Sequence, residues 1–253
     1  MSGVGGVMPL KVVFMNAESR HTGPLLLGVD TCGPSGSVAL DRFSSATLET
    51  LGQIELKGRT YSATLISAVG ELLRAAGAEV HGLAGIVVVN GPGSFTGVRV
   101  GVSAVKGLAF GAGIPVVAVS RLAVLAAKAG IASAALDAHR GELFLRVERP
   151  HSKLEELLAG ASELAALPRK PERVAVCDNA AAEILAAVWP ATQILATSAP
   201  LASDALALAG PRLLAGEQVD LALLDGHYLR RSDAEIFGRD VITQHAAAEA
   251  KGV

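Results

Sequence analysis

Aromatic side chains are scarce in this sequence, cysteines are few, and neither sign of charge predominates. Phe, Trp and Tyr make up 4% of the 253 residues while hydrophobic residues make up 51%, so the core must be built from Ala, Val and Leu. The formal net charge of −2 provides no positive surface, so we do not expect the chain to hold RNA or DNA by itself. Cys32 and Cys177 lack the spacing of a metal or redox motif, which favours a reducing, cytoplasmic location.

Long apolar runs are also missing. No uninterrupted apolar span of about 18 residues is present, so no membrane helix is expected. Pro9 and Lys11 interrupt the early apolar run, which argues against a secretory signal. Residues 1–23 are rich in glycine and show no hydrophobic period, and we predict a disordered N-terminal tail there.

The most distinctive stretch runs from Ile86 to Gly111. Its first four residues are an apolar, β-branched run typical of a buried strand. Asn90-Gly-Pro-Gly93 then breaks the strand, and Ser94 or Thr96 can cap a helix that continues to Gly111. Small residues recur along this helix at spacings of three and four: Gly97, Gly101, Ala104, Gly107 and Gly111.

Each interior glycine costs a helix roughly 1 kcal/mol relative to alanine. We therefore expect the small residues to permit a close backbone approach. The partner in that approach is either the sheet of this chain or a helix of another protein, and the residues alone leave both interpretations open.

Strand and helix signals divide the chain into two related halves. The first half is predicted as three strands followed by helix, strand, helix and strand, the order of a ribonuclease-H-like module. Its elements are expected at 25–30, 37–40, within 47–56, 61–77, 86–89, 96–111 and 114–119. The second half repeats this order more loosely, at 120–130, 134–137, 143–147, 174–177, 180–189, 193–196 and 203–215. Residues 149–171 are read as a charged, proline-punctuated passage without an element.

We therefore predict an α/β fold of two ribonuclease-H-like halves, each a mixed sheet with flanking helices. Residues 24–119 form the first domain and 120–202 the second, smaller domain. The C-terminal segment 203–253 is expected to pack back on the first domain.

The glycine loop and two strand-end aspartates are candidates for binding a nucleotide or another anion. Gly91-x-Gly93-x-x-x-Gly97 resembles a loosened dinucleotide fingerprint, but no Lys-Ser/Thr follows it and the opening hairpin disfavours a Rossmann fold. An anion could still sit at the start of the helix. Asp30 and Asp137 each end a strand, and we favour simple turn formation for both. The candidate contacts are Asp30, Thr31, Ser35, Gly93, Ser94 and Asp137.

No catalytic set emerges from the sequence. Ser94 lacks the flanking glycines of a nucleophile elbow. No two of the six histidines are three or four residues apart, so the sequence contains no local metal-binding motif. We expect no cofactor and no catalytic residue.

One motif is specific enough to indicate a family. Gly91-Pro-Gly-Ser-Phe-Thr-Gly-Val-Arg-Val-Gly101 closely resembles the signature of the bacterial TsaB (YeaZ) proteins. Four other pieces fit in order: Leu27–Thr31 with Gly36–Leu40, Lys106–Ala109, Asp137–Glu142 and Tyr228–Arg230. The resemblance covers about residues 25 to 235. It implies an actin/sugar-kinase-like fold and a role in making threonylcarbamoyladenosine on tRNAs that read codons beginning with A.

The resemblance also implies that the chain is a non-catalytic scaffold. Its partner is a TsaD-type transferase subunit, which carries the metal and with which it forms a heterodimer. A TsaE-type ATPase joins them, and the chain contacts tRNA only through the complex. We also expect a homodimer when the chain is alone, because pairing would bury an exposed apolar helical face. TsaD-like catalytic chains carry a His-x-x-x-His motif, and the matching residues here are Arg121 and Leu125, neither of which can replace imidazole.

Relatives pair with the TsaD-type subunit through a helical bundle. The resemblance therefore implies that the helices at 61–77 and 96–111 form the contact surface of this chain. Many relatives open the first helix with His-Ser or His-Thr, and this chain has Tyr61-Ser62. The expected contacts are Leu65, Val69, Leu72, Gly97, Gly101, Val102, Ala104 and Val105. The rival hypothesis is a small ATP-binding kinase or ATPase that uses Asp30 and Asp137. A peptidase is less well supported, because no nucleophile-base or metal-pair spacing is present.

Overall fold

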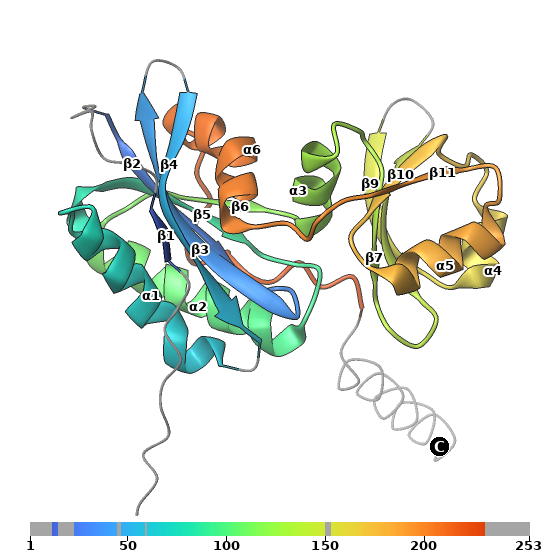
Figure 1. The fold of residues 1–253 in the computed structure, drawn as a ribbon, viewed down its shortest axis with the longest axis horizontal. Helices are drawn as coiled ribbons and strands as arrows, with labels where there is room; N and C mark the ends of the chain where they lie inside the picture. The colour runs from blue at the N-terminus through green and yellow to red at the C-terminus, as the bar shows by residue number, and fades with distance from the viewer. Residues whose placement is uncertain (1–11, 15–22, 45–46, 59, 150–152, 231–253) are drawn as a thin grey trace, which may run out of the picture.

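A computed structural model describes the protein over residues 12–14, 23–44, 47–58, 60–149 and 153–230. Two mixed β-sheets, each flanked by helices, form two lobes that lie side by side (Figure 1). The predicted α/β fold of two ribonuclease-H-like halves is confirmed.

The first lobe is built on a six-stranded sheet in the order β1-β4-β3-β2-β5-β6. Strand β1 pairs antiparallel with β4, β4 with β3 and β3 with β2, whereas β2, β5 and β6 run parallel to one another. Helices α1 and α2 cover one face and α6 covers the other (Figure 1). The strands are β1 (Val12–Phe14), β2 (Leu25–Asp30), β3 (Ser35–Ser44), β4 (Thr47–Lys57), β5 (Leu83–Val89) and β6 (Val116–Val119). The helices are α1 (Tyr61–Ala75), a 3₁₀ turn η1 (Val80–Gly82), α2 (Phe95–Ala112) and α6 (Ala202–Leu214).

The second lobe is built on a five-stranded sheet in the order β11-β10-β7-β8-β9. Its antiparallel strands are β7, β8 and β9, and β10 and β11 extend it in parallel. Reading from β9, the order β9-β8-β7-β10-β11 repeats the order β4-β3-β2-β5-β6 of the first lobe. The elements are α3 (Arg121–Lys128), β7 (Ala134–Asp137), β8 (Leu143–Arg149), β9 (Lys153–Ala159), α4 (Ala161–Ala166), β10 (Arg173–Val176), α5 (Asn179–Val188) and β11 (Gln193–Ala196).

The helix that ends each half packs on the sheet of the other half. Helix α3 follows β6 but contacts β7, β8 and β10, and α6 follows β11 but contacts β2, β3 and β5. The two helices also contact each other. This exchange ties the lobes together at their junction, where the end of β2 meets the start of α3.

Besides the short 3₁₀ turn η1, two strands and one helix lie where the sequence predicts no element. Strand β1 falls inside the segment predicted as a tail and instead pairs with β4; residues 1–11 and 15–22 lie outside the described residues. Strand β9 and helix α4 form within the charged passage 149–171. Strand β9 is at the edge of its sheet, where charged residues are tolerated. Its acidic residues therefore do not give the sequence pattern from which a strand is predicted.

Asp41 is a buried carboxyl group in β3. Its burial raises the pKa from 3.8 to about 6, against the lowering effect of a hydrogen bond from Thr50. The folded state therefore holds this proton more tightly than the unfolded chain. Asp41 stabilises the fold fully only below about pH 4, and this contribution is lost as the pH rises through about 6.

We expect the Asp41→Asn variant to gain about 2 kcal/mol of unfolding free energy relative to the wild type between about pH 4 and pH 7. Urea unfolding across this range measures the difference. A Glu49→Gln variant, which changes an exposed carboxylate on β4, serves as the control and should show no such change. A constant difference between Asp41→Asn and the wild type would contradict the shifted pKa.

Candidate functional site

The turn between β5 and α2 fixes the start of the long helix against the first hairpin. Ser94 caps α2, since its Oγ accepts the Gly97 N–H at 3.3 Å and its own N–H donates to the Cys32 carbonyl at 2.8 Å. The Thr31 hydroxyl donates to the Gly97 carbonyl at 2.7 Å. Gly91 has φ of +116°, a conformation that residues with a Cβ rarely adopt. The signature motif therefore seats the first turn of α2 on the end of β2.

The glycines of α2 divide into two groups with different surroundings. A Cβ at Gly97 would lie 2.1 Å from the Thr31 carbonyl oxygen, and one at Gly101 would lie 2.3 Å from the Thr31 hydroxyl. A Cβ at Gly107 or Gly111 would meet nothing within 4 Å. Close packing within the chain therefore explains the first half of the small-residue stripe, and a partner helix on the second half stays a prediction. The first two glycines allow close packing within the chain, and the last two leave an open surface.

Most of the predicted partner contacts lie in the core of the first lobe, and this prediction is corrected. The helical stripe with the strongest apolar character faces the sheet of its own chain, because burial there removes the most apolar surface from water. Ala104 is half-buried, and the others cannot touch a partner without unpacking the lobe. The buried residues are Leu65, Val69, Leu72, Gly97, Gly101, Val102 and Val105.

The exposed face of α1 and α2 is made of a different set of residues. Gly107 and Gly111 on α2 are exposed, and a Cβ at Gly70 on the adjacent α1 would also meet nothing within 4 Å. Ile66, one helical turn before Gly70 on α1, is 54% exposed. We call Ile66, Gly70, Gly107 and Gly111 the open helix face. Sequence reasoning missed Ile66 and Gly70, because the phase of a helix cannot be read from spacing alone.

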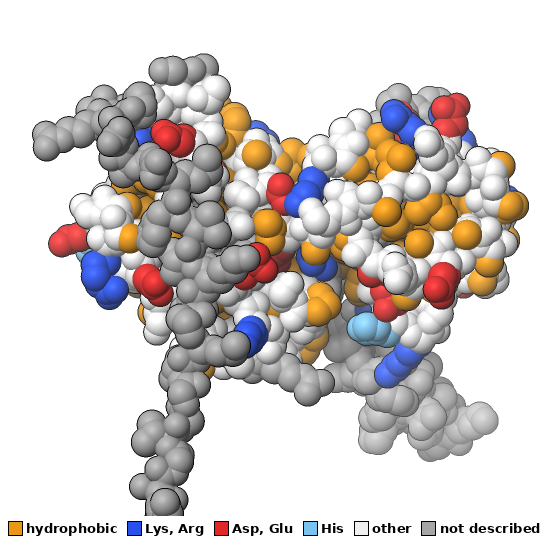
Figure 2. All heavy atoms as spheres, in the orientation of Figure 1, with side chains coloured by type: hydrophobic (Ala, Val, Ile, Leu, Met, Phe, Trp, Pro, Cys, Tyr) orange, Lys and Arg blue, Asp and Glu red, His pale blue; other side chains and the backbone are white. Residues whose placement is uncertain are grey.

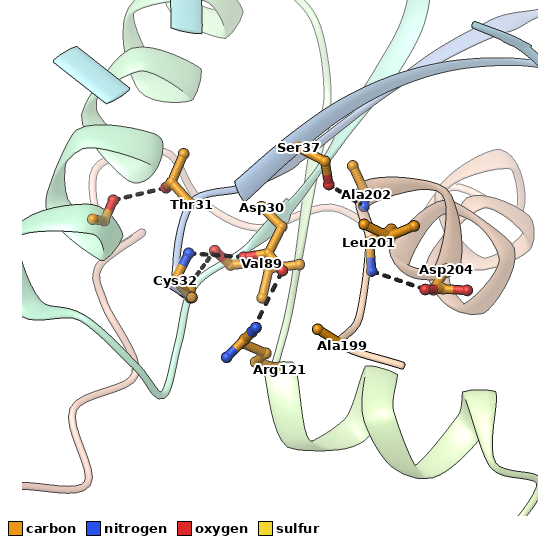
Figure 3. Close-up of polar contacts among 12 residues, drawn as sticks. Asp30, Thr31, Cys32, Ser37, Val89, Arg121, Ala199, Leu201, Ala202 and Asp204 are labelled. Carbon is orange, nitrogen blue, oxygen red and sulfur yellow. Dashed lines mark hydrogen bonds and ion pairs between the residues drawn. The ribbon is translucent and has the colours of Figure 1, made fainter. Parts of the chain in front are cut away.

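A buried ion pair joins the two lobes at their junction (Figure 3). Arg121 is the first residue of α3, and its Nε lies 3.5 Å from the Asp30 Oδ2 at the end of β2. The Asp30 side chain is 1% exposed, and its Oδ1 accepts the Cys32 N–H at 2.8 Å. Burial alone would lower the pKa of Arg121, but the Asp30 carboxylate raises it above its ordinary value. The ion pair is therefore enclosed, and the Arg121 guanidinium is held in its charged form.

The turn after β2 is packed around this guanidinium. A Cβ at Gly33 would lie 2.4 Å from the Arg121 Nη2, so the turn leaves no room for a side chain there. The Tyr61 hydroxyl donates to the Gly33 carbonyl at 2.8 Å, and burial raises the pKa of Tyr61 to about 12. Burial also raises the pKa of the Cys32 thiol well above its ordinary value. Tyr61, which departs from the family pattern, thus acts as a donor that fixes the turn.

The structure brings together part of the predicted anion site. Asp30, Thr31, Gly93 and Ser94 meet where the turn after β2 packs on the start of α2. Thr31 and Ser94 are hydrogen-bonded within the chain, whereas the Asp30 Oδ2 has the 3.5 Å ion-pair contact with Arg121 and no hydrogen bond. A Cβ at Gly93 would lie 2.2 Å from the Cys32 carbonyl oxygen. Of the predicted contacts in this turn, Ser35 is exposed.

Asp137 belongs to the corresponding turn of the second lobe. Its Oδ1 accepts the His139 N–H at 2.7 Å, and its Oδ2 lies 3.0 Å from the His139 Nδ1. His139 and Arg140 both have positive φ, of 61° and 57°. The contacts of Asp137 are those of a turn former in a tight, left-handed connection.

The C-terminal segment 219–230 crosses from one lobe to the other. Its Val219 N–H donates to the Val116 carbonyl of β6 at 2.8 Å, and the His227 N–H donates to Asn90 at 2.6 Å. The His227 Nε2 lies 2.9 Å from the Glu156 carboxylate in β9. Burial raises the pKa of Glu156, but the hydrogen bonds that its carboxylate accepts, first from His227, outweigh burial and lower the pKa.

Two exposed aromatic rings meet where this segment passes the start of α2. The Phe95 and Tyr228 ring centroids are 5.2 Å apart, and the Arg99 Cζ lies 3.8 Å from the Phe95 centroid. The sequence indicates Tyr228 only through its family motif. Nothing in the sequence predicts its contact with Phe95, because the two positions are far apart in the chain.

Charge and metal ligands are dispersed over the described part of the chain. On the face shown in Figure 2, basic and acidic side chains are interspersed. Within the described ranges, no group of three or more His, Cys, Asp or Glu side chains could hold a metal ion. In the same ranges, no helix combines the length and apolar character needed to cross a membrane.

The repeated strand order and the paired strand-end turns define a two-lobed protein of the ribonuclease-H-like class. Residues 53–197 match the family model described as TsaD: tRNA N6-adenosine threonylcarbamoyltransferase. The chain is 36% identical over 123 residues to a tRNA threonylcarbamoyladenosine biosynthesis protein TsaB of Bacillus subtilis, covering 47% of this chain and 52% of that protein. It is 33% identical over 125 residues to TsaB of Escherichia coli, again covering 47% and 52%.

A solved structure agrees with these matches over a longer span. It is a Pseudomonas aeruginosa protein described as similar to peptidase YEAZ, with 29% identity and a TM-score of 0.68, covering 82% of this chain and 100% of that one. The matches span about half the length of the curated relatives. The chain belongs to the family that the TsaD model describes and, within it, to the TsaB (YeaZ) proteins.

Proposed function

We propose that this chain is a non-catalytic subunit in tRNA threonylcarbamoyladenosine biosynthesis that binds and activates a TsaD-type transferase subunit. The observation that carries the proposal is the open helix face. Three glycines whose Cβ positions are unobstructed let a partner helix approach the backbone of α1 and α2 closely. Ile66, 54% exposed one helical turn before Gly70, supplies an apolar contact to such an interface.

The junction of the lobes supports a non-catalytic role. By the resemblance, catalytic relatives carry metal-binding histidines where this chain has Arg121 and Leu125. Here Arg121 is held by Asp30, and Leu125 is fully buried. A carboxylate engaged by an internal guanidinium is not available to hold a metal or to act on a nucleotide. This contact therefore favours the scaffold over the kinase hypothesis.

The same proposal extends to the rest of the assembly. A TsaE-type ATPase joins the pair, and tRNA is bound through the complex and not by this chain alone. Without the transferase, the open helix face is left to pair with a second copy of the chain, because exposed apolar helical surface seeks burial.

We expect a Gly107→Glu variant to lose the transferase. Glutamate on the open helix face fills the space needed by a partner helix and must be desolvated in the interface. The monomer should stay folded, because glutamate favours a helix more than glycine does and nothing lies within 4 Å of this position. Size-exclusion chromatography with light scattering, on the chain mixed with the TsaD-type protein of the same organism, measures the complex.

The control is Ala186→Glu, which places the same charge on an exposed position of α5 in the other lobe. Wild type and Ala186→Glu should both elute at the heterodimer mass. Glutamate at Gly101 is unsuitable, because that position packs on Thr31 and the change would unfold the lobe. Full binding by Gly107→Glu would refute the surface, and no complex with the wild type would refute the proposed function.

A further inference from the structure

Strand β6 is an edge strand whose outward side is partly open. The Ile86 N–H donates to the Pro115 carbonyl and the Asn90 N–H donates to the Val119 carbonyl, at 3.0 and 3.1 Å. Backbone groups of a strand alternate in direction, so residues 115, 117 and 119 face β5, while 116 and 118 face away. The Val116 carbonyl confirms this parity by accepting the Val219 N–H from the outer side.

Ala118 is the next outward-facing residue, and it lines a cavity of about 450 Å³. Within the described ranges, no hydrogen bond outside the strand ladder engages the Ala118 N–H or carbonyl. The segment 219–227 forms the opposite wall of the cavity. A backbone donor and a backbone acceptor of one edge strand thus face an open space one residue beyond the point where Val219 is bound.

Apolar side chains flank this open edge. A second cavity of about 350 Å³ shares Val219 with the first and is lined by Phe110, Ile114 and Pro115. Phe110 is 84% exposed at the second cavity, and Leu223 is 80% exposed at the first. Two neighbouring apolar hollows on either side of a strand contact suit alternate side chains of an extended peptide.

The rim of the first cavity is acidic. Asp220 and Asp225 are both exposed and both line it. Their Oδ1 atoms accept the N–H groups of Ala222 and Gly226, at 2.8 and 2.7 Å, which fixes each carboxylate in place. The neighbouring Lys106 is held on the same segment, where its Nζ donates to the Leu224 carbonyl at 3.0 Å, so the two rim carboxylates outnumber it by one.

We propose that the open edge of β6 binds an extended segment of a partner protein in which basic and apolar residues alternate. The segment pairs with Ala118 through its backbone, its apolar side chains enter the two hollows, and its basic side chains meet Asp220 and Asp225. Backbone pairing supplies the affinity and the acidic rim selects the charge of the segment. The second hollow borders the open helix face, because Phe110 lies one helical turn after Gly107 on α2. The edge of β6 and the acidic rim are not part of that face, and binding there does not depend on the proposed function.

Amide hydrogen exchange tests the edge in the free protein. The Ala118 amide should exchange faster than those of Val117 and Val119, which face β5. The probe for binding is a heptapeptide of alternating Lys and Val with blocked termini. Its binding is followed by NMR of the protein amides. It should shift and protect the Ala118 amide, while the same peptide with Glu in place of Lys should not.

The charge is tested with an Asp220→Asn/Asp225→Asn double variant, in which the Lys-Val peptide should bind about tenfold more weakly. The control is Glu79→Gln/Glu183→Gln, which removes two exposed carboxylates elsewhere and should leave binding unchanged. Three results would overturn the proposal: an unaffected Ala118 amide, equal binding of the Glu peptide, or protection of Ala118 in the free chain by concentration-dependent self-association, which would assign the edge to a second copy.

Discussion

A Gly101→Ala variant should lose about 3 kcal/mol of unfolding free energy. The new Cβ would lie 2.3 Å from the Thr31 hydroxyl, far inside van der Waals contact. Thr31 is fully buried and its hydroxyl is bound to the Gly97 carbonyl, so it cannot move aside without breaking that bond. Overpacking of this kind costs on the order of 1–3 kcal/mol, and the lost hydrogen bond adds about 1 kcal/mol.

Gly107→Ala and Gly111→Ala are the matched controls, because they make the same change on the same helix in open space. Each should stabilise the chain by up to about 1 kcal/mol through helix propensity. Thermal unfolding should therefore move in opposite directions for the two groups, by about 2–4 °C for each kcal/mol. A destabilised Gly107→Ala, or a Gly101→Ala variant as stable as the wild type, would contradict the division of the glycines.

The order of elements could be predicted because it depends on local signals. Apolar runs bounded by glycine and proline mark β2, β5 and β6, and Ser94 marks the start of α2. The repeat of this order in the second half is visible for the same reason. Strand β9 was missed because an edge strand needs only its neighbour to form, so its own residues carry a weak signal.

The role of each glycine could not be predicted, although their presence was conspicuous. Gly97, Gly101, Gly107 and Gly111 have the same spacing signal. Only the position of Thr31 at the end of β2 separates the first pair from the second. The predicted partner contacts lie on the most apolar stripe of α1 and α2, and that stripe packs on the sheet of the same chain. A partner can therefore reach only the exposed residues of the two helices, whose apolar pattern is weak.

The ion pair at the lobe junction shows a further limit of sequence reasoning. The sequence identifies Asp30 as a strand-end carboxylate and Arg121 as a departure from a metal-binding motif, but it gives no sign that the two residues meet. They meet because α3 crosses to the second lobe directly after β6, a consequence of the exchanged helices. A contact that depends on how two halves are assembled leaves no trace in the spacing of either residue.

Replacing Arg121 alone by methionine should cost the protein about 4 kcal/mol. The change leaves the Asp30 carboxylate enclosed without its counter-charge, and removing one partner of a buried pair costs about 3–5 kcal/mol. The Asp30→Asn variant should lose a similar amount, because it leaves the Arg121 guanidinium without its carboxylate. Urea unfolding, followed by far-ultraviolet circular dichroism, measures both values.

The double variant Asp30→Asn/Arg121→Met distinguishes the ion pair from simple packing. If charge compensation is the reason for the loss, the double variant should lie within about 1.5 kcal/mol of the wild type, since replacing both members of a buried pair is often nearly neutral. The Asn side chain can still accept the Cys32 N–H, so the turn after β2 keeps that hydrogen bond. Additive losses in the double variant would mean that each residue acts through its packing alone. In that case the guanidinium would merely fill the space that the turn after β2 leaves open, and the support it gives to a non-catalytic role would fall with it.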